Sequence, residues 1–356
     1  AAPAQQQPQQ QQPAQQQRVT QGQAAKSEQE WMSRTIATGV QQLSVPDQGL
    51  VCIYVLSNQR AGFKAGAIQK PECQRRCHEY LRWFIKLAGS FDAKFTALVG
   101  VSLEDSPLGH KLNRTLLVPN APMSSSNRAF VHFPDHHAMQ LYDEWMSNGR
   151  RPFRWSLSPA WQMKNRIAFW RGVSTGRWTR IKMWESDTLV NQRAYMVYLS
   201  KAWPALMDFD LTGVQEEPSY NEEKQKLMQS WGLTNVEAVS LEELGKYRFL
   251  MVLDGNAADW DTLRMMLTGS LVLKVESQWT QWWSHLAKPY EHFVPVRNDL
   301  KDLVKQVKWA FENDNAAQRI ALTGHRLAYQ VMKDLEQESR AAIRAASWND
   351  LLTEKS

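Results

Sequence analysis

The sequence has few cysteines and no long apolar run, and each of these absences excludes a class of protein. Three cysteines in 356 residues, Cys52, Cys73 and Cys77, are too few for a disulfide scaffold. Cys73 and Cys77 stand four residues apart, on one face of an expected helix, and no further Cys or His at metal-ligand spacing completes a zinc site. We interpret these cysteines as structural residues.

No stretch of about 20 apolar residues occurs, so no segment is expected to span a bilayer. The chain starts at Ala1 without the charged and apolar regions of a signal peptide, so we expect a signal or membrane anchor to be absent or already removed. The net charge of +6 is modest, and Lys and Arg are interspersed with Asp and Glu along most of the length. This balance predicts a mixed-charge surface and disfavours nucleic acid as a partner.

The composition divides the chain into four parts. Residues 1–25 are almost entirely Gln, Pro and Ala, which predicts a disordered tail or stem. Apolar runs then alternate with helical patterns, which predicts two α/β domains, one at residues 26–160 and one at residues 161–335, followed by a C-terminal helix at residues 336–356. The expected strands are Leu50–Leu56, Phe95–Val101 and Ala129–Phe133 in the first domain, and Ile167–Trp170, Phe249–Leu253, Leu271–Val275 and His292–Val296 in the second.

Parallel strands place their functional loops at their carboxyl ends, so the residues after each expected strand are candidate site residues. Helical spacing begins again near Asp299, with Asn298 or Asp299 as the expected N-cap. A later helix is expected to end at Gly324.

Two segments combine a strand with a small-residue turn. In NRIAFWRGVSTGRWTR (Asn165–Arg180), the strand is followed by Gly172, Ser174, Thr175 and Gly176, and we expect a helix to start directly after them. Arg171, Arg177 and Arg180 add planar donors that suit a diphosphate. The same pattern also marks an ordinary strand-to-helix corner.

The second segment, FLMVLDGNAADWDTLRMMLTGSLVLK (Phe249–Lys274), repeats this arrangement. Its strand ends at Asp254, Gly255 supplies the turn, and Ala257 and Ala258 precede an expected helix whose amino end faces a ligand. Alternatively, Asp254 is a cap and Gly255 an ordinary turn residue.

Several blocks stand together in an order and spacing that resemble glycosyltransferase family 90. The blocks are AFWRG-x-x-TG followed by Arg180, KYRFLMVLDGNAA, MMLTGSLVLK, KPYEHFVPV and ENDNAAQRIALTG. The resemblance implies a GT-B fold, in which two Rossmann-like domains face each other across a cleft. It implies inverting transfer of glucose or xylose from a UDP-sugar, without a bound cofactor or metal, to a hydroxyl of a protein or polysaccharide acceptor.

The resemblance also implies site residues and a location. The UDP-binding residues would be Arg171, Gly172, Thr175, Gly176, Arg180, Asp254, Gly255, Asn256, Ala258, Trp260, Arg264, Ser277 and His292. Arg180 would neutralise the leaving diphosphate, and Trp260 would lie near the base. The implied location is the secretory pathway, in the Golgi or endoplasmic reticulum lumen, and any membrane anchor would lie in a removed N-terminal segment.

The catalytic base of this family is an aspartate in the N-terminal domain, after a strand and beside a proline. Asp135 in FVHFPDHH matches that placement and is the predicted base. It would take the proton of the acceptor hydroxyl. His136 and His137 are the alternatives, since histidine is a common general base, and Asp135 could instead only start the turn after Pro134.

Two features of this sequence complicate the function that the resemblance implies. Family members usually carry an arginine where this chain has Asp261, and an acid there would repel a diphosphate unless Arg264, one turn on, supplies a cation. This departure keeps a second hypothesis open, a catalytically inactive member that binds a protein or glycan. Asp208-Phe-Asp210 has the spacing of a metal-binding motif, but we interpret it as structural.

Overall fold

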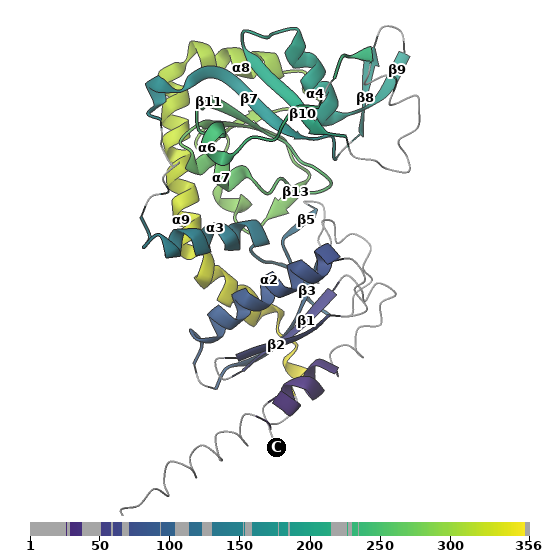
Figure 1. Ribbon diagram of the computed structural model, residues 1–356, viewed down its shortest axis with the longest axis vertical. Helices are drawn as coiled ribbons and strands as arrows, with labels where there is room; N and C mark the ends of the chain where they lie inside the picture. Colours follow the sequence, from purple (N-terminus) through teal and green to yellow (C-terminus); the bar gives the residue numbers. More distant parts are fainter. Residues whose placement is uncertain are drawn as a thin grey trace, which may run out of the picture. The chain divides into compact units, whose positions relative to one another are not determined.

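The computed structural model describes residues 26, 29–37, 51–57, 60–65, 71–92, 94–103, 114–122, 130–151, 153, 159–176, 178–183, 186–214, 226, 230–233 and 235–352. The chain forms two compact units. The first comprises residues 1–103, 111–116 and 343–356, and the second comprises residues 104–110 and 117–342. Both combine helices with strands, as Figure 1 shows, which confirms the predicted α/β class.

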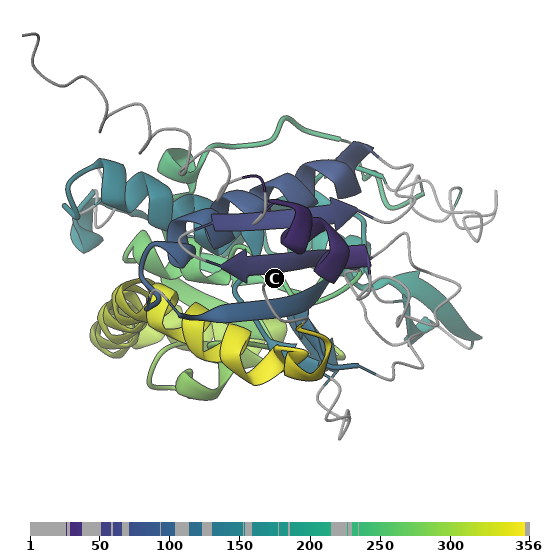
Figure 2. The same ribbon diagram turned by 90° about the horizontal axis from the view of Figure 1, so that it is seen from below.

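The first unit is built on a three-stranded antiparallel arrangement in the order β2-β1-β3. β1 (Val51–Ser57) is the central strand, and β2 (Arg60–Ala65) and β3 (Thr96–Ser102) both pair antiparallel to it. All seven residues of β1 are buried, which explains its unbroken apolar sequence. Figure 2 shows these strands lying side by side.

The parallel direction expected for the strands Leu50–Leu56 and Phe95–Val101 is wrong. These strands form β1 and β3, which run antiparallel, with Val55 opposite Leu98. The hairpin to β2 reverses the chain before the helix α2 (Pro71–Ala88), so the strand–helix–strand crossover joins β2 to β3 and leaves β1 between them. The hairpin was not predicted from the sequence because β2, RAGFKA, has little apolar character.

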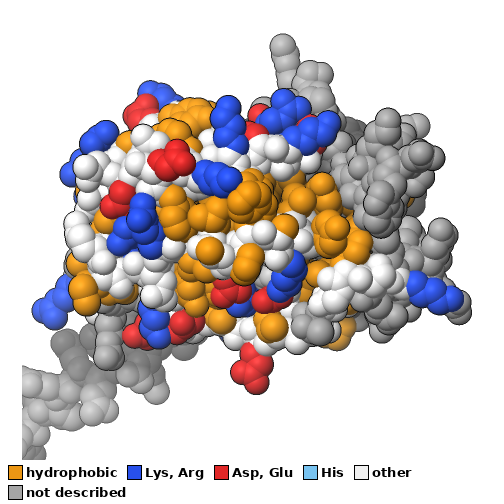
Figure 3. Space-filling view, turned by 90° about the horizontal axis from the view of Figure 1, so that it is seen from above, with side chains coloured by type: hydrophobic (Ala, Val, Ile, Leu, Met, Phe, Trp, Pro, Cys, Tyr) orange, Lys and Arg blue, Asp and Glu red, His pale blue; other side chains and the backbone are white. Residues whose placement is uncertain are grey.

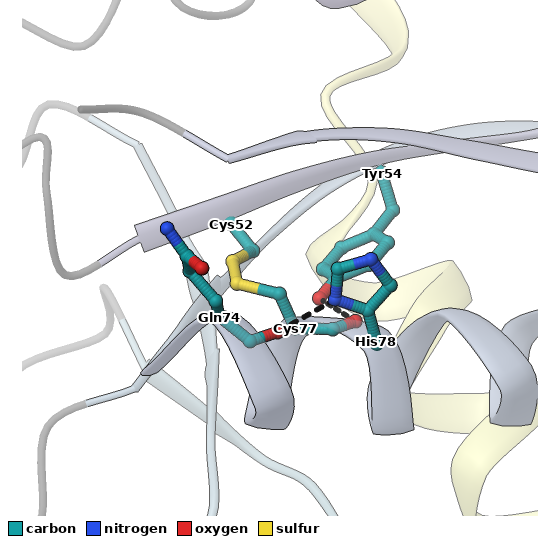
Figure 4. Close-up of a disulfide and its surroundings, with 5 residues drawn as sticks. All are labelled: Cys52, Tyr54, Gln74, Cys77 and His78. Carbon is teal, nitrogen blue, oxygen red and sulfur yellow. Dashed lines mark hydrogen bonds between the residues drawn. A yellow bond between two sulfur atoms is a disulfide. The ribbon is translucent and has the colours of Figure 1, made fainter. Parts of the chain in front are cut away.

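A disulfide joins β1 to α2 between Cys52 and Cys77, whose Cα atoms are 6.1 Å apart (Figure 4). Next to it the hydroxyl of Tyr54 donates a hydrogen bond to the Cys77 carbonyl at 2.9 Å. α2 turns the side chains of Tyr80, Trp83, Phe84 and Leu87 into the same core. Cys73, one turn before Cys77, is a half-buried free thiol.

Removing the disulfide should destabilise the first unit. A bridge between residues 25 positions apart restricts the unfolded chain and contributes about 3 kcal/mol in the loop-entropy description. We expect Cys52→Ala with Cys77→Ala to lower the melting temperature by several degrees. The matched control is Cys73→Ala, which alters the same helix without touching the bridge and should melt like the parent. Equal melting of the double variant and the parent would contradict a stabilising bridge.

The last residues of the chain pack back on the first unit. Trp348 donates from its backbone N–H to the Leu98 carbonyl at 2.9 Å and from its indole N–H to the Thr115 carbonyl at 2.7 Å. The position of Gly100 has no room for a side chain, since a Cβ there would lie 2.6 Å from Leu116 and 2.9 Å from Trp348. Trp348 therefore anchors the end of the chain on β3.

The second unit contains a five-stranded sheet in the order β10-β7-β11-β12-β14. Its neighbouring strands all run parallel, as predicted for this half of the chain. Its strands are β7 (Asn165–Val173), β10 (Met207–Gly213), β11 (Tyr247–Val252), β12 (Leu271–Val275) and β14 (Val294–Val296). Buried apolar side chains from all five strands form its core. The predicted strands of this half are confirmed.

Helices α4 (Gln192–Lys201) and α8 (Leu303–Glu312) pack on this sheet. Figure 3 views the face that carries α4 and α8, where Lys and Arg lie among Asp and Glu, as the interspersed charges predicted. Lys308 lies 4.0 Å from the ring centre of Trp203 in this unit. The N-cap of α8 is Asp302, not the predicted Asn298 or Asp299, and Asp299 instead pairs with Arg297 at 2.7 Å.

The longest helix is α9 (Asp314–Ala346), and it replaces the separate helices predicted around Gly324 and at residues 336–356. Gly324 lies inside α9 rather than at the end of a helix. A Cβ at Gly324 would lie 2.5 Å from the His292 carbonyl oxygen, so this glycine serves close packing rather than helix termination. No helix among the described residues is long and apolar enough to cross a membrane.

Residues 117–160 belong to the second unit, which differs from the predicted boundary at residue 160. Within this unit β5 (Asn120–Pro122) pairs antiparallel with β13 (Trp279–Gln281). The remaining elements of the unit are β4 (Leu116–Val118), β6 (Phe130–His132), α3 (His136–Ser147), β8 (Trp178–Met183), β9 (Ser186–Asn191), α6 (Leu241–Leu244) and α7 (Thr262–Leu267).

Candidate functional site

A cavity of about 380 Å³ opens at the carboxyl edge of the parallel sheet in the second unit. The loops that follow β7, β11 and β12 form it together with the start of α4. Its described lining residues are Gly176, Gln192, Asp254, Gly255, Asn256, Glu276, Gln278 and Trp279. Both the size and the place are typical of a ligand site on an open parallel sheet.

The loop after β7 reaches α4 by a detour. The sequence predicted a helix directly after Gly176, but the hairpin of β8 and β9 comes first, and α4 starts only at Gln192. Asn191 closes the detour because its side-chain amide donates to the Ser174 carbonyl at 3.0 Å. Its carbonyl oxygen caps α4 by accepting from the Ala194 N–H at 3.1 Å. The amino end of α4 therefore lies next to the loop that follows β7.

Gly176 and Gly255 let the two loops touch. Gly176 has a φ of 96°, and a Cβ there would lie 2.6 Å from the Gly255 carbonyl oxygen. The Gly176 N–H donates to the Asn256 side chain at 3.1 Å. A Cβ at Gly255 would lie 2.9 Å from the Thr175 hydroxyl. These contacts account for the glycines that the sequence pattern singled out.

Arg193, in the first turn of α4, ties the same loops together. Its guanidinium donates to the Val173 carbonyl at 3.0 Å and the Thr175 hydroxyl at 2.8 Å, on the β7 side. It also donates to the Leu253 carbonyl at 2.9 Å and the Asp254 carbonyl at 3.0 Å, on the β11 side. No local sequence pattern predicts this role for Arg193, because its partners lie up to 61 residues away along the chain.

Three aspartates follow β11. Burial, and after it the charge of Asp261, raise the pKa of Asp259 to about 6, against the opposing charges of Arg193 and Lys274. Burial also raises the pKa of Asp254, while Lys274 and a hydrogen bond with Ser277 lower it. The loop therefore carries three carboxyl groups, and two of them, Asp254 and Asp259, are weaker acids than an ordinary aspartate.

Asp261 has a cationic neighbour at the predicted spacing. Arg264, three residues on in α7, lies 3.5 Å from the Asp261 carboxylate. The Asp261 N–H donates to the Asp259 carboxylate at 2.8 Å, which orients the start of α7. The predicted compensating cation is present, and in this structure it contacts the acid itself.

Asp135 follows β6 and is the N-cap of α3. It is only 2% exposed, and its carboxylate accepts a hydrogen bond from the Ala138 N–H at 2.9 Å. Burial raises the pKa of Asp135 to about 6, backbone hydrogen bonds oppose the shift, and the charge of Asp261 adds to it. The rings of His136 and His137 lie 6.2 and 6.4 Å from that of Trp260. The predicted base thus lies near the β11 loop.

The structure brings together only part of the predicted site. Gly176, Asp254, Gly255 and Asn256 line the cavity, and Ala258 packs with the lining residue Trp279. Thr175 accepts a hydrogen bond from Arg193, which also bonds the lining residue Asp254, and Ser277 forms a hydrogen bond with the Asp254 carboxylate. Gln192, Glu276, Gln278 and Trp279 are lining residues that the sequence reading missed, although Glu276 and Gln278 also follow an expected strand and could have been found by that rule.

The predicted residues Arg171 and His292 are not among the described residues that line the cavity. Arg171 pairs with Asp208 at 2.8 Å and lies 3.8 Å from Asp210, which ties it to the edge strand β10. His292 precedes the amino end of β14, and its ring nitrogen accepts from the Lys288 N–H at 3.0 Å. Arg180 is on β8, and its side chain lies outside the described part of the structure.

Asp208 and Asp210 have cationic partners. Asp210 pairs with Lys201 at 2.5 Å in addition to its contact with Arg171. Gly172, next to Arg171 on β7, leaves room for the Trp170 ring, which would lie 2.6 Å from a Cβ at this position. These contacts support the structural interpretation of the Asp-x-Asp spacing and assign Gly172 a packing role.

Comparison with known proteins identifies one matching family. The model of glycosyl transferase family 90 matches residues 147–338, more than half of the 356 residues. Human Protein O-glucosyltransferase 3 is 28% identical over 239 residues, covering 65% of this chain and 43% of its own length. Protein O-glucosyltransferase 1 of Rattus norvegicus is 27% identical over 196 residues, covering 55% of this chain and 43% of its own length.

This chain spans less than half the length of these curated relatives. Among solved structures, Anabaena Alr3699/HepE in complex with UDP and glucose is 11% identical, with a TM-score of 0.40. That comparison covers 67% of this chain and 64% of the other.

Proposed function

This chain belongs to glycosyl transferase family 90, and from that membership we propose that it transfers a sugar from a UDP-sugar to a hydroxyl of a protein or glycan acceptor. The names of its relatives support glucose as the sugar, and xylose is the alternative. The observation that carries the proposal is the cavity at the carboxyl edge of the parallel sheet, since most of its lining falls in two loops that the family model matches.

The lining has chemistry that suits a nucleotide sugar. The amino end of α4, where Gln192 borders the cavity, offers the positive end of the helix dipole for phosphate oxygens. Asn256, Glu276 and Gln278 offer acceptors and amide donors for ribose and sugar hydroxyls. The indole of Trp279 offers a flat apolar face.

We assign the role of base to Asp135 and inverting chemistry to the reaction. The acceptor oxygen attacks the anomeric carbon, the bond from that carbon to the UDP oxygen breaks, and the acceptor proton passes to the Asp135 carboxylate. A buried carboxylate with a pKa raised to about 6 accepts protons better than an ordinary aspartate, and it is still ionised near pH 7. Arg193, Arg264 and the amino end of α4 would balance the leaving diphosphate in place of a metal ion.

A second candidate function is binding without catalysis. Asp254 and Glu276 line the cavity, and none of its described lining residues is Lys or Arg. Acidic groups at this place oppose a diphosphate by like charge. A catalytically inactive member that holds a protein or glycan would have the same fold and lack turnover.

The proposed location is the secretory pathway. The Cys52–Cys77 disulfide supports it, because disulfides form and persist in oxidising compartments such as the endoplasmic reticulum lumen. The relatives are named as enzymes that glucosylate proteins, which supports a protein acceptor.

Release of UDP separates the two candidate functions. We expect the chain to release UDP from UDP-glucose in the presence of a folded protein or glycan acceptor, with UDP-xylose as the competing donor. Thermal stabilisation by UDP without turnover of either donor, across a panel of acceptors, would favour the inactive member. The absence of both UDP stabilisation and turnover would contradict the proposed transferase function.

A further inference from the structure

We propose that Arg193 is the positioning residue of the donor cavity, the group that holds the β7 and β11 loops in a binding-competent arrangement. This inference rests on the proposed function for its ligand, a nucleoside diphosphate. It rests on geometry alone for the role of Arg193 in the loops.

The guanidinium of Arg193 forms hydrogen bonds with both the β7 and the β11 loops. Arg193 makes four hydrogen bonds, two to each loop, at 2.8 to 3.0 Å. The Val173 carbonyl belongs to the last residue of β7, and the Leu253 and Asp254 carbonyls directly follow the end of β11. The planar guanidinium supplies donors to all three at fixed angles.

The residues that accept the Arg193 hydrogen bonds adjoin the cavity. Asp254 lines the cavity, and Thr175 precedes the lining residue Gly176. A Cβ at Gly255 would lie 3.3 Å from the Arg193 guanidinium, so the same group also sets how closely the β11 loop approaches α4. A shift of Arg193 would therefore move Gly176, Asp254 and Gly255 together.

The positive charge of Arg193 lies close to the carboxylates of the β11 loop. Burial lowers the pKa of Arg193, and the carboxylates of Asp259, Asp254 and Asp261 act against that shift, in this order of strength. Arg193 is thus the cation beneath an acidic loop, and it offsets the repulsion that these carboxylates would exert on a diphosphate. The ring of Trp170, 5.6 Å from the guanidinium, borders it from β7.

Lysine cannot reproduce this arrangement. A lysine ammonium keeps the charge but offers three donors from one point, whereas the four acceptors of Arg193 belong to two separate loops. Arg193→Lys therefore isolates the positioning role from the charge. Arg193→Gln removes both.

The matched control is Arg248→Lys. Arg248 belongs to the same unit and is 9% exposed, and it pairs with Asp314 at 2.8 Å near the amino end of β11, the opposite end from the cavity. The two lysine variants make the same chemical change in similar burial. They differ in whether the lost bonds hold the cavity loops.

Amide hydrogen exchange on the ligand-free protein tests the positioning role without any activity. We expect the N–H groups of Gly176 and Gly255, which are hydrogen-bonded across and within the loops, to exchange about ten-fold faster in Arg193→Lys. The same groups should exchange within about two-fold of the parent in Arg248→Lys. Unchanged exchange in Arg193→Lys, or equal acceleration in both variants, would overturn the proposal.

Titration with UDP then tests the consequence for the site. Arg193→Lys should weaken UDP binding by about ten-fold or more and raise the KM for the donor, with the KM for the acceptor unchanged. If Arg193→Lys does not fold, Thr175→Val removes one of the four acceptors, and it should weaken UDP in the same direction by a smaller factor. Parent-like UDP binding in every folded Arg193 and Thr175 variant would contradict the inference.

The two failures are distinguishable. If the parent chain does not bind UDP, the proposed function fails while the exchange experiment still decides the role of Arg193. If the parent binds UDP and the Arg193 variants bind it equally well, only the positioning role fails.

Discussion

Replacing Asp135 with asparagine should lower sugar transfer by at least about 100-fold, without lowering the melting temperature at pH 7. Asparagine is as good an N-cap as aspartate, so the bond to the Ala138 N–H, at 2.9 Å in the parent, can be kept. The amide cannot accept the acceptor proton. The expected result is therefore a folded protein that still binds the donor and does not turn it over.

The pH dependence of stability provides an independent check on this residue. Burial raises the folded-state pKa of Asp135 from 3.8 to about 6, so ionising it disfavours the folded state. Its contribution is complete below about pH 4 and is lost as the pH rises through 6, on the order of 3 kcal/mol for the buried group. Asp259, whose pKa is also raised to about 6, adds a loss in the same window.

The Asp135→Asn variant lacks the part of this pH-dependent loss of folding stability that Asp135 causes. We expect the variant to melt at the same temperature as the parent near pH 4 and at a higher temperature near pH 7. Asp135→Ser is the matched control, because serine also caps a helix and cannot act as a base, so it should be equally inactive. Full turnover by the folded Asn and Ser variants would leave Asp135 a helix cap and would make His136 and His137 the next residues to test.

The second large effect is expected at Gly176. Alanine there would place its Cβ 2.6 Å from the Gly255 carbonyl oxygen, closer than real Cβ contacts come, and at a φ of 96°. The clash is with backbone, so the two loops must separate. Because both loops line the cavity, Gly176→Ala should reduce UDP binding by about 100-fold or more, which is close to 3 kcal/mol.

The matched control is Gly232→Ala. Gly232 also has a positive φ, 65°, in the same unit, but a Cβ there meets nothing within 4 Å. It should cost about 1 kcal/mol of backbone strain and leave UDP binding unchanged. Titration of UDP into both variants measures the difference. Equal UDP affinity in Gly176→Ala and Gly232→Ala would contradict the role of the loop contact.

The parallel sheet was predictable because its strands carry the signal themselves. The runs FLMVL and LVLKV are apolar throughout, as strands buried on both faces must be, and they became β11 and β12. The turn glycines were also predictable, because a small residue after such a strand indicates a close approach. Gly176 and Gly255 meet each other as that rule suggests, although the partner of each was unknown.

The missed features depend on contacts between distant residues. The direction of β1 relative to β3 depends on a short hairpin strand with little apolar character. The hairpin of β8 and β9 lies between β7 and α4 in the sequence, and the return of the chain depends on the bond from Asn191 to the distant Ser174 carbonyl. Arg193 bonds residues about 20 and 60 positions away, and no local pattern marks it. Long-range placement, rather than element type, limited the prediction.

The acidic loop after β11 changes how the family resemblance is interpreted. Asp261 stands where an arginine was expected, and the structure gives it Arg264 as a neighbour at 3.5 Å. Arg193 lies beneath the same loop and is influenced by all three of its carboxylates. Arg193 and Arg264 are thus the cations beside this acidic loop, and of the two only Arg264 was among the residues that the resemblance implied.

The central claim is that the cavity of about 380 Å³ at the carboxyl edge of the sheet binds the UDP part of the donor. The most direct test is calorimetric titration of UDP into the parent chain, beside Gly176→Ala. Saturable binding with one UDP per chain, lost in Gly176→Ala, is the predicted result. No heat of binding at about millimolar UDP, or parent-like affinity in a folded Gly176→Ala, would contradict the claim.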